Sequence, residues 1–94
     1  MPVLLVRHRA TDYAVWKAVF DEHAATLRAY GSRGGRVFRS DADPSEIWTL
    51  LEWDDLDRAR LFAQSDDLHE VMVSAGLADN PKFWFLEETD RPSP

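Results

Sequence analysis

The sequence contains no cysteine, and its 94 residues include only three histidines and one asparagine. The absence of cysteine excludes disulfide bonds, thiolate nucleophiles and zinc sites built on thiolates. The chain also lacks the Ser-His-Asp order of serine hydrolases, a glycine-rich phosphate loop and the glycine motif of dinucleotide-binding proteins. We therefore expect neither a serine triad nor a nucleotide-dependent reaction.

Long hydrophobic runs and an excess of positive charge are absent as well. The apolar stretch at residues 3–6 is short and is followed, rather than preceded, by arginine, so it resembles neither a signal peptide nor a membrane span. The net charge is −6, from 17 acidic and 11 basic residues, which disfavours phosphate backbones and anionic membranes as partners. We expect a cytoplasmic protein that binds neither nucleic acid nor membrane.

Aromatic residues, by contrast, are plentiful. Four Trp, five Phe and two Tyr occur in a chain that is long enough for only one domain. Each of these side chains can bury about 150–250 Å² of surface, so one small core has little room for all of them. Domains of this size are also only marginally stable on their own. Both observations favour a dimer.

One stretch organises the predicted fold. Residues 46–53 carry two Trp and three branched apolar residues with no breaker, which is typical of a central strand covered on both faces. Residues 3–9 are apolar on both side-chain phases and are predicted to form a second central strand. Asp54 and Asp55 follow the strand at 46–53, at the position where a helix N-cap belongs.

The other elements are predicted from periodicity, caps and turns. A helix is expected from Thr11 or Asp12 to about Tyr30, and Gly31 would supply its left-handed cap. After this helix we expect a continued turn at 32–35, a strand at 36–40 and a turn at 41–45 that leads into the strand at 46–53. A helix at 56–64 follows, and then a second helical piece at 68–75, which is capped by residues 65–67 and ends at Gly76. A break at 79–81 precedes the last strand, at 82–87. Residues 1–88 are predicted to form a single domain, and the polar, proline-rich residues 89–94 a frayed C-terminal tail.

The order of these elements is β-α-β-β-α-β, the ferredoxin-like pattern of the α+β class. In this pattern a four-stranded antiparallel sheet carries helices on one face only. Strands that are apolar on both phases would then leave an apolar face uncovered. A second copy of the chain would cover it, so we expect a homodimer.

Several motifs strengthen this interpretation. The element order, together with Glu52-Trp53-Asp54-Asp55 followed by Ala59, Phe62, Ser65 and Leu68, resembles the dimeric α/β barrel superfamily, which includes the antibiotic biosynthesis monooxygenases and several polyketide cyclases. Within this superfamily, three segments resemble a group of small bacterial cyclase-like proteins. They are Asp12-Tyr13 with Trp16 and Phe20, Gly34-Gly35-Arg36-Val37-Phe38-Arg39, and Phe85-Leu86-Glu87-Glu88. The resemblance covers about residues 3–88 and is specific for the fold, because the matching positions are mostly caps, turns and core.

The resemblance implies a cofactor-independent monooxygenase or polyketide cyclase. In such an enzyme an apolar pocket holds a small aromatic or polyketide-like molecule, and one histidine or carboxylate moves a proton. The alternative is a homodimer that binds a small molecule without converting it. A third activity of the superfamily, haem degradation, uses an Asn, a Trp and a His. The only asparagine here is Asn80, in a predicted loop, so this alternative lacks one of its three residues. No metal, haem or flavin cofactor is expected.

His8 is the first candidate catalytic residue. It ends the first strand on the same phase as Leu4 and Val6. We predict that it lies at the rim of a cavity on the helix-free face of the sheet, within reach of Glu52. A neutral imidazole there would suit general-base catalysis near neutral pH. The structural alternative is a hydrogen-bonded histidine at a strand edge.

Glu52 is the second candidate catalytic residue. It alternates with Leu50 and Trp48, so the three side chains should point to one face of the central strand. A carboxylate among apolar side chains must be paired, protonated or functional. The structural alternative is an ion pair with Arg36 or Arg39 of the neighbouring strand.

Five residues are predicted to bind the substrate, because they could line a flat apolar cavity suited to an aromatic ligand: Tyr13, Arg36, Phe38, Trp48 and Trp84. Their structural alternative is a role in the core or the dimer contact. His23, on the apolar side of the first helix, is assigned to packing or a helix-to-helix hydrogen bond, and His69 to the surface. No pair of histidines has ligand spacing, so no metal site is expected.

Overall fold

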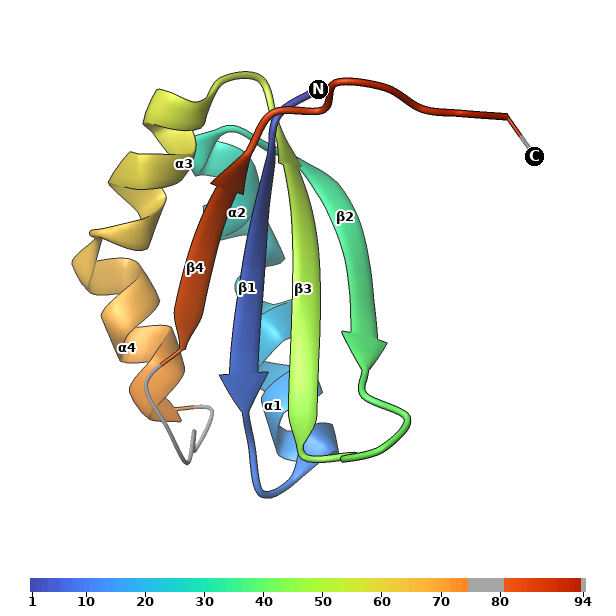
Figure 1. The fold of residues 1–94 in the computed structure, drawn as a ribbon. Coiled ribbons are helices and arrows are strands. Elements are labelled where there is room, and N and C mark those ends of the chain that lie inside the picture. Colours follow the sequence, from blue (N-terminus) through green and yellow to red (C-terminus); the bar gives the residue numbers. More distant parts are fainter. Residues whose placement is uncertain (75–80, 94) are drawn as a thin grey trace.

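The structure is a computed structural model that describes residues 1–74 and 81–93. In chain order its elements are β1 (Val3–Arg9), α1 (Tyr13–Glu22), α2 (Ala24–Tyr30), β2 (Ser32–Arg39), β3 (Glu46–Trp53), α3 (Leu56–Ala63), α4 (Asp66–Ser74) and β4 (Lys82–Leu86). The strands form one antiparallel sheet in the order β2-β3-β1-β4, and the helices lie behind one face of it, as Figure 1 shows. The predicted α+β class and ferredoxin-like sheet are confirmed, with two helices in each crossover.

β3 and β1 are the two central strands, as their apolar composition predicts. They pair so that Val3 lies opposite Glu52 and His8 lies opposite Ile47. Because side chains alternate between the faces of a strand, every second residue points toward the helices. The buried residues on this helix-covered face are Leu4, Val6 and His8 of β1 and Ile47, Thr49, Leu51 and Trp53 of β3.

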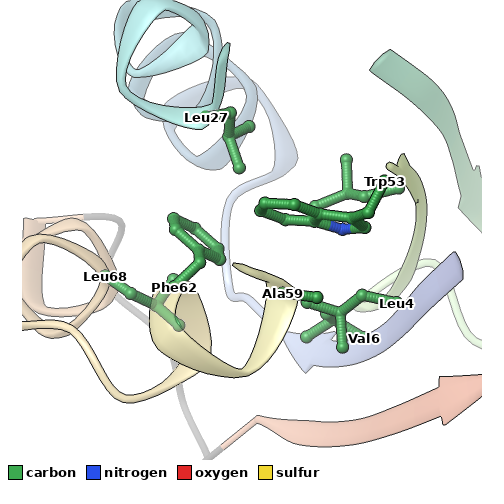
Figure 2. Packing of buried hydrophobic residues seen from close by; sticks show 8 residues of the cluster. Leu4, Val6, Leu27, Trp53, Ala59, Phe62 and Leu68 are labelled. Atoms are coloured by element: carbon green, nitrogen blue, oxygen red, sulfur yellow. The ribbon is translucent and has the colours of Figure 1, made fainter. Parts of the chain in front are cut away.

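Trp53 lies at the centre of the hydrophobic core. Its side chain is fully buried, and its ring lies 5.6 Å from that of Phe62 on α3. In Figure 2, Leu27 of α2 lies on one side of the Trp53 ring, and Leu4 of β1 and Ala59 of α3 lie on the other. Full burial of a large apolar side chain contributes roughly 1.5–3 kcal/mol. Trp53 therefore links the central strand to helices of both crossovers.

The first helical region is divided at His23, where a single helix was predicted. α1 ends at Glu22 and α2 begins at Ala24, and His23 between them has φ −100° and ψ 12°. Its backbone N–H donates to the carbonyl oxygen of Phe20 at 3.2 Å, which is an i→i−3 bond that tightens the turn. The apolar face continues through this point, so periodicity alone contains no sign of the break.

β2 begins at Ser32, four residues before the strand predicted at 36–40. The residues expected to continue a turn instead pair with β3 through a bulge between Ser32 and Gly34, and Gly34 has φ +102°. At Gly35 the two strands approach so closely that an added Cβ would overlap the carbonyl oxygen of Leu50. The two glycines thus permit a bulged edge strand.

The predicted helix caps are present. Asp12 accepts hydrogen bonds from the backbone N–H groups of Ala14 and Val15 at 2.9 and 3.3 Å, and Asp55 accepts one from Arg58 at 2.9 Å. Gly31 ends α2 with φ +115°.

The later element boundaries differ slightly from the prediction. α3 ends at Ala63, one residue early, and α4 begins at Asp66, two residues early, while β4 ends at Leu86. The predicted helix end at Gly76 and most of the break at 79–81 lie outside the described residues.

After β4 the chain has no regular secondary structure through residue 93. Glu88 accepts a hydrogen bond from the Met1 amino group at 3.0 Å and another from Arg91 at 2.7 Å. Fraying of residues 89–94 stays a prediction. Across residues 1–74 and 81–93, no helix combines the length and the apolar character needed to cross a membrane.

Candidate functional site

A cavity lies between the sheet and its helices, and we call it the helix–sheet cavity. Its volume is about 50 Å³. The polar side chains in its described lining are His8, Thr49, His23 and Thr26, and the apolar ones include Trp16, Phe20, Leu27, Leu51 and Met72. Imidazole and hydroxyl groups therefore face a space that is otherwise hydrophobic.

His8 enters this cavity from the central strand β1. Its side chain is only 8% exposed, and its Nε2 lies 3.5 Å from Oγ1 of the buried Thr49 on β3. Its Nδ1 is buried and has no hydrogen-bond partner among the described residues. Burial lowers the pKa of His8 to about 4, because the apolar surroundings disfavour the charged form. The imidazole is therefore neutral near pH 7.

An aromatic pair from α1 forms the wall beside His8. The Trp16 ring lies 5.4 Å from the His8 ring, and Phe20 stacks on Trp16 with centroids 5.1 Å apart and planes 19° apart. Positions four residues apart share one face of a helix, so the Asp12 cap that starts α1 also sets where these rings point. Offset stacking of this kind provides a flat apolar surface for another ring.

His23 is a site residue that sequence reasoning assigned to packing or a helix-to-helix contact. Its Nδ1 lies 2.8 Å from the carbonyl oxygen of Val19 in α1. Because a carbonyl can only accept, Nδ1 carries a proton and donates it, and in the neutral form of the ring Nε2 is an acceptor. His23 lines the helix–sheet cavity, so this acceptor belongs to a second imidazole in the same site. Its spacing from Trp16 and Phe20 on one helix face could have indicated this.

Thr49 was also missed from the sequence. It is 1% exposed and is the only polar residue among the helix-facing positions of β3. Because Val6 lies opposite Thr49 and His8 opposite Ile47, His8 and Thr49 are diagonal neighbours on the same face of the sheet. A hydroxyl on an otherwise apolar strand face was the available signal.

The predicted proximity of His8 and Glu52 is wrong. Glu52 lies opposite Val3, five positions along β1 from His8, and it points to the face of the sheet without helices. His8 points to the helix-covered face, where the helix–sheet cavity is. The two residues therefore cannot share one proton-transfer step within a single chain.

The expected ion pair of Glu52 is also not formed. The guanidinium group of Arg36 lies 5.8 Å from the centre of the Phe38 ring, and that of Arg39 lies 4.6 Å from the centre of the Tyr13 ring. Neither arginine makes an ion pair with Glu52 in the part of the chain that is described. A catalytic role of Glu52 would have to involve groups on the face of the sheet without helices.

The five predicted substrate-binding residues lie on two faces of the sheet. Trp48 and Trp84 stack on the face without helices, with centroids 5.7 Å and planes 22° apart. Arg36 and Phe38 lie on the same face, because they are opposite Leu50 and Trp48. Tyr13 lies on the helix-covered side, 6.0 Å from Trp16. They do not form one cavity within a single chain.

Among residues 1–74 and 81–93, no group of three or more His, Cys, Asp or Glu side chains could hold a metal ion.

No family model matches the chain, and no curated protein matches its sequence. Its structure, however, matches solved structures over nearly their full length. A protein from Bordetella bronchiseptica, provisionally named an antibiotic biosynthesis monooxygenase, has a TM-score of 0.79 at 19% identity, with 94% of this chain and 96% of that chain covered. The chain has the fold of the antibiotic biosynthesis monooxygenases.

Two further solved structures agree with this result. SnoaB, a cofactor-independent oxygenase from Streptomyces nogalater, has a TM-score of 0.76 at 14% identity, with 96% of this chain and 94% of that chain covered. A provisionally named antibiotic biosynthesis monooxygenase from Deinococcus radiodurans has a TM-score of 0.72 at 13% identity, with 100% and 98% covered. At these identities the matches establish the fold. They confirm the fold that the predicted resemblance implies.

Proposed function

We propose that the protein is a cofactor-independent monooxygenase that acts on a small phenol or polyketide-like enol in the helix–sheet cavity. His8 carries the proposal, because it is a buried neutral imidazole whose Nδ1 has no hydrogen-bond partner within residues 1–74 and 81–93. A buried polar atom without a hydrogen bond costs roughly 1–3 kcal/mol. The hydroxyl group of a bound phenol would supply the missing partner.

His8 acts as the base in this proposal. In the reactive tautomer Nε2–H donates to Thr49 Oγ1, so the lone pair of Nδ1 is free to accept the phenol proton. Burial disfavours the resulting imidazolium, and attraction to the adjacent phenolate offsets part of that cost. Proton transfer therefore proceeds together with the movement of electrons out of the ring.

Dioxygen is the co-reactant and takes those electrons. One ring C–H becomes a carbonyl, the phenolic carbon becomes the second carbonyl, and the other oxygen atom leaves as water. The four electrons lost by the ring reduce one dioxygen, so phenol plus dioxygen gives quinone plus water. The named activity of SnoaB, a cofactor-independent oxygenase, supports this reaction class.

The other cavity residues would position the substrate. The stacked Trp16 and Phe20 rings offer a flat surface to an aromatic ring, and His23 Nε2 offers an acceptor to a second hydroxyl group. The cavity of about 50 Å³ is smaller than the roughly 150 Å³ that accommodates benzene. A substrate must therefore displace wall side chains, and Met72 of α4 is the most adaptable of those named.

The test is oxygen uptake with 1-naphthol as the probe phenol. Wild-type protein should consume dioxygen and form 1,4-naphthoquinone, and His8→Asn should reduce turnover on the order of 100-fold or more with little change in melting temperature. His69→Asn is the matched control, because His69 lies exposed on α4. Equal turnover by wild type and His8→Asn would exclude the enzyme proposal.

A binding protein is the second candidate function. It is favoured by the lining of the helix–sheet cavity, which is apolar apart from two imidazoles and two hydroxyl groups among the described residues. In that case 1-naphthol would bind without oxygen uptake. Native mass spectrometry of protein purified under mild conditions would identify a retained ligand.

We also propose that the chain forms a homodimer through the face of the sheet without helices. This face carries half-buried Leu5 and Leu50 in the central strands, and Trp84 and Phe38 in the edge strands are 38% and 46% exposed. None of the four described helices, α1 to α4, covers it, as Figure 1 shows. A second copy would bury these side chains, and Trp48, Trp84 and Phe38 would then belong to the dimer contact.

A further inference from the structure

A second cavity lies between α2 and the edge strand β2, and we call it the α2–β2 groove. Its volume is about 380 Å³, within the roughly 300–1,000 Å³ typical of small-molecule sites. Five apolar side chains contribute to its lining: Phe20, Ala24, Leu27, Val37 and Leu51. The groove is thus roomy enough for a molecule with a two-ring apolar body.

The charged residues that line this groove are all of one sign, and Asp54, which pairs with Arg33, is not among the lining residues. Arg28 of α2 and Arg33 of β2 line it, and no Asp or Glu belongs to its described lining, although the whole chain has a net charge of −6. Arg36 borders the groove too, but its guanidinium group lies over the Phe38 ring, on the face of the sheet without helices. Arg28 and Arg33 are the cations that a bound molecule would meet.

Both guanidinium groups retain unused donors. Arg28 is exposed, and its guanidinium group makes no hydrogen bond, ion pair or ring contact within the described ranges 1–74 and 81–93. Arg33 uses its Nε to donate to Asp54 at 2.8 Å, and its two terminal nitrogens have no other partner in those ranges. A guanidinium fork matches the two oxygens of a carboxylate.

We infer that the α2–β2 groove binds a small organic anion, with an apolar ring or chain on the groove floor and a carboxylate between Arg28 and Arg33. An unpaired cation in a protein with excess negative charge favours an anionic ligand over a neutral one of the same shape. The inference goes beyond the proposed oxygenase, because it requires no reaction at His8. Phe20, Leu27 and Leu51 line both cavities, so the groove lies directly behind the wall of the helix–sheet cavity.

The test is an NMR titration of ¹⁵N-labelled protein with 2-naphthoate and, separately, with the neutral analogue 2-naphthalenemethanol. The amide signals of Gly34 and Gly35 report on the groove, because both residues line it. The carboxylate should shift these signals and bind at least about 10-fold more tightly than the alcohol, and raising the salt concentration should weaken its binding. Signals of His8 and Thr49 should shift less than those of the two glycines.

Substitution of single arginines then tests which of them contacts the carboxylate. Arg28→Gln should weaken 2-naphthoate binding by about 5-fold or more while leaving the weak binding of the alcohol unchanged. Arg60→Gln is the matched control, because Arg60 lies on α3 beside Phe85, away from the groove. Arg33→Gln should have an effect similar to that of Arg28→Gln.

Four results would overturn the inference, and the first three concern protein that binds 2-naphthoate. These are equal affinity for the two probes, no difference between Arg28→Gln and Arg60→Gln, and shifts confined to the helix–sheet cavity. Absence of any binding of 2-naphthoate at millimolar concentration would overturn it as well. Because none of these measurements uses oxygen uptake, they separate the groove from the proposed reaction at His8.

Discussion

His8 and Thr49 are diagonal neighbours on the helix-covered face of the two central strands, with Nε2 of the imidazole 3.5 Å from Oγ1 of the threonine. This is the only hydrogen bond that the His8 ring makes in the described part of the chain, and its Nδ1 is unsatisfied. The pair therefore places one protonatable atom, free of protein partners, in an apolar cavity.

The first prediction is a pH dependence of stability caused by His8. Its pKa is about 4 in the folded protein and 6.5 ordinarily, so between these values the unfolded chain binds more protons than the folded one. The contribution of neutral His8 to stability is present above pH 6.5 and is lost as the pH falls toward 4, by up to about 3 kcal/mol. Urea unfolding between pH 4 and 7 measures it, and His8→Asn should flatten this part of the profile.

The second prediction concerns the role of Thr49. Thr49→Val preserves the shape of the side chain and removes the hydroxyl group that contacts His8. We expect a change in unfolding free energy of about 1 kcal/mol or less, together with a change in the ¹⁵N chemical shifts that report the His8 tautomer. Turnover should fall about 10-fold if the tautomer matters. An unchanged tautomer would show that Thr49 only fills space.

The third prediction concerns access to the helix–sheet cavity. Met72→Ala removes a half-buried cavity-lining side chain, so it should strengthen 1-naphthol binding while lowering the unfolding free energy by roughly 1–3 kcal/mol. Val73→Ala is the control, because Val73 is 70% exposed on the same helix. Weaker or unchanged binding by Met72→Ala would place the ligand elsewhere.

The fourth prediction concerns the dimer. Leu50→Lys puts a charge at the centre of the sheet face without helices and should shift the protein to a monomer in analytical ultracentrifugation. Leu61→Lys, at an exposed position on α3, should leave the dimer intact. The melting temperature of wild type should rise with protein concentration. A wild-type monomer at micromolar concentration would refute the proposed interface.

The fifth prediction separates the two glycines of β2. Gly35→Ala would bring its Cβ against the carbonyl of Leu50, so β2 and β3 must move apart and stability should fall by more than about 3 kcal/mol. Gly34→Ala meets no atom but must adopt φ +102°, which costs roughly 1–2 kcal/mol. Chemical denaturation of both variants gives the comparison. A milder effect at position 35 than at 34 would contradict it.

The sequence alone determined the order of the elements and several of their ends. Central strands could be recognised because β1 and β3 are apolar on both phases, and the caps at Asp12, Asp55 and Gly31 could be recognised because capping depends on a few adjacent residues. These features are local, and periodicity or side-chain chemistry within a few residues is enough to set them.

Tertiary structure decided which residues share a site. Because both phases of β1 and β3 are apolar, hydrophobicity could not tell which phase faces the helices. That choice depends on the register, which pairs Val3 with Glu52 and so puts His8 and Glu52 on opposite faces. A shift of one residue in pairing would reverse the relation. The register and the positions of the helices, set by packing across the whole chain, therefore brought His8 together with Thr49 and His23 instead of Glu52.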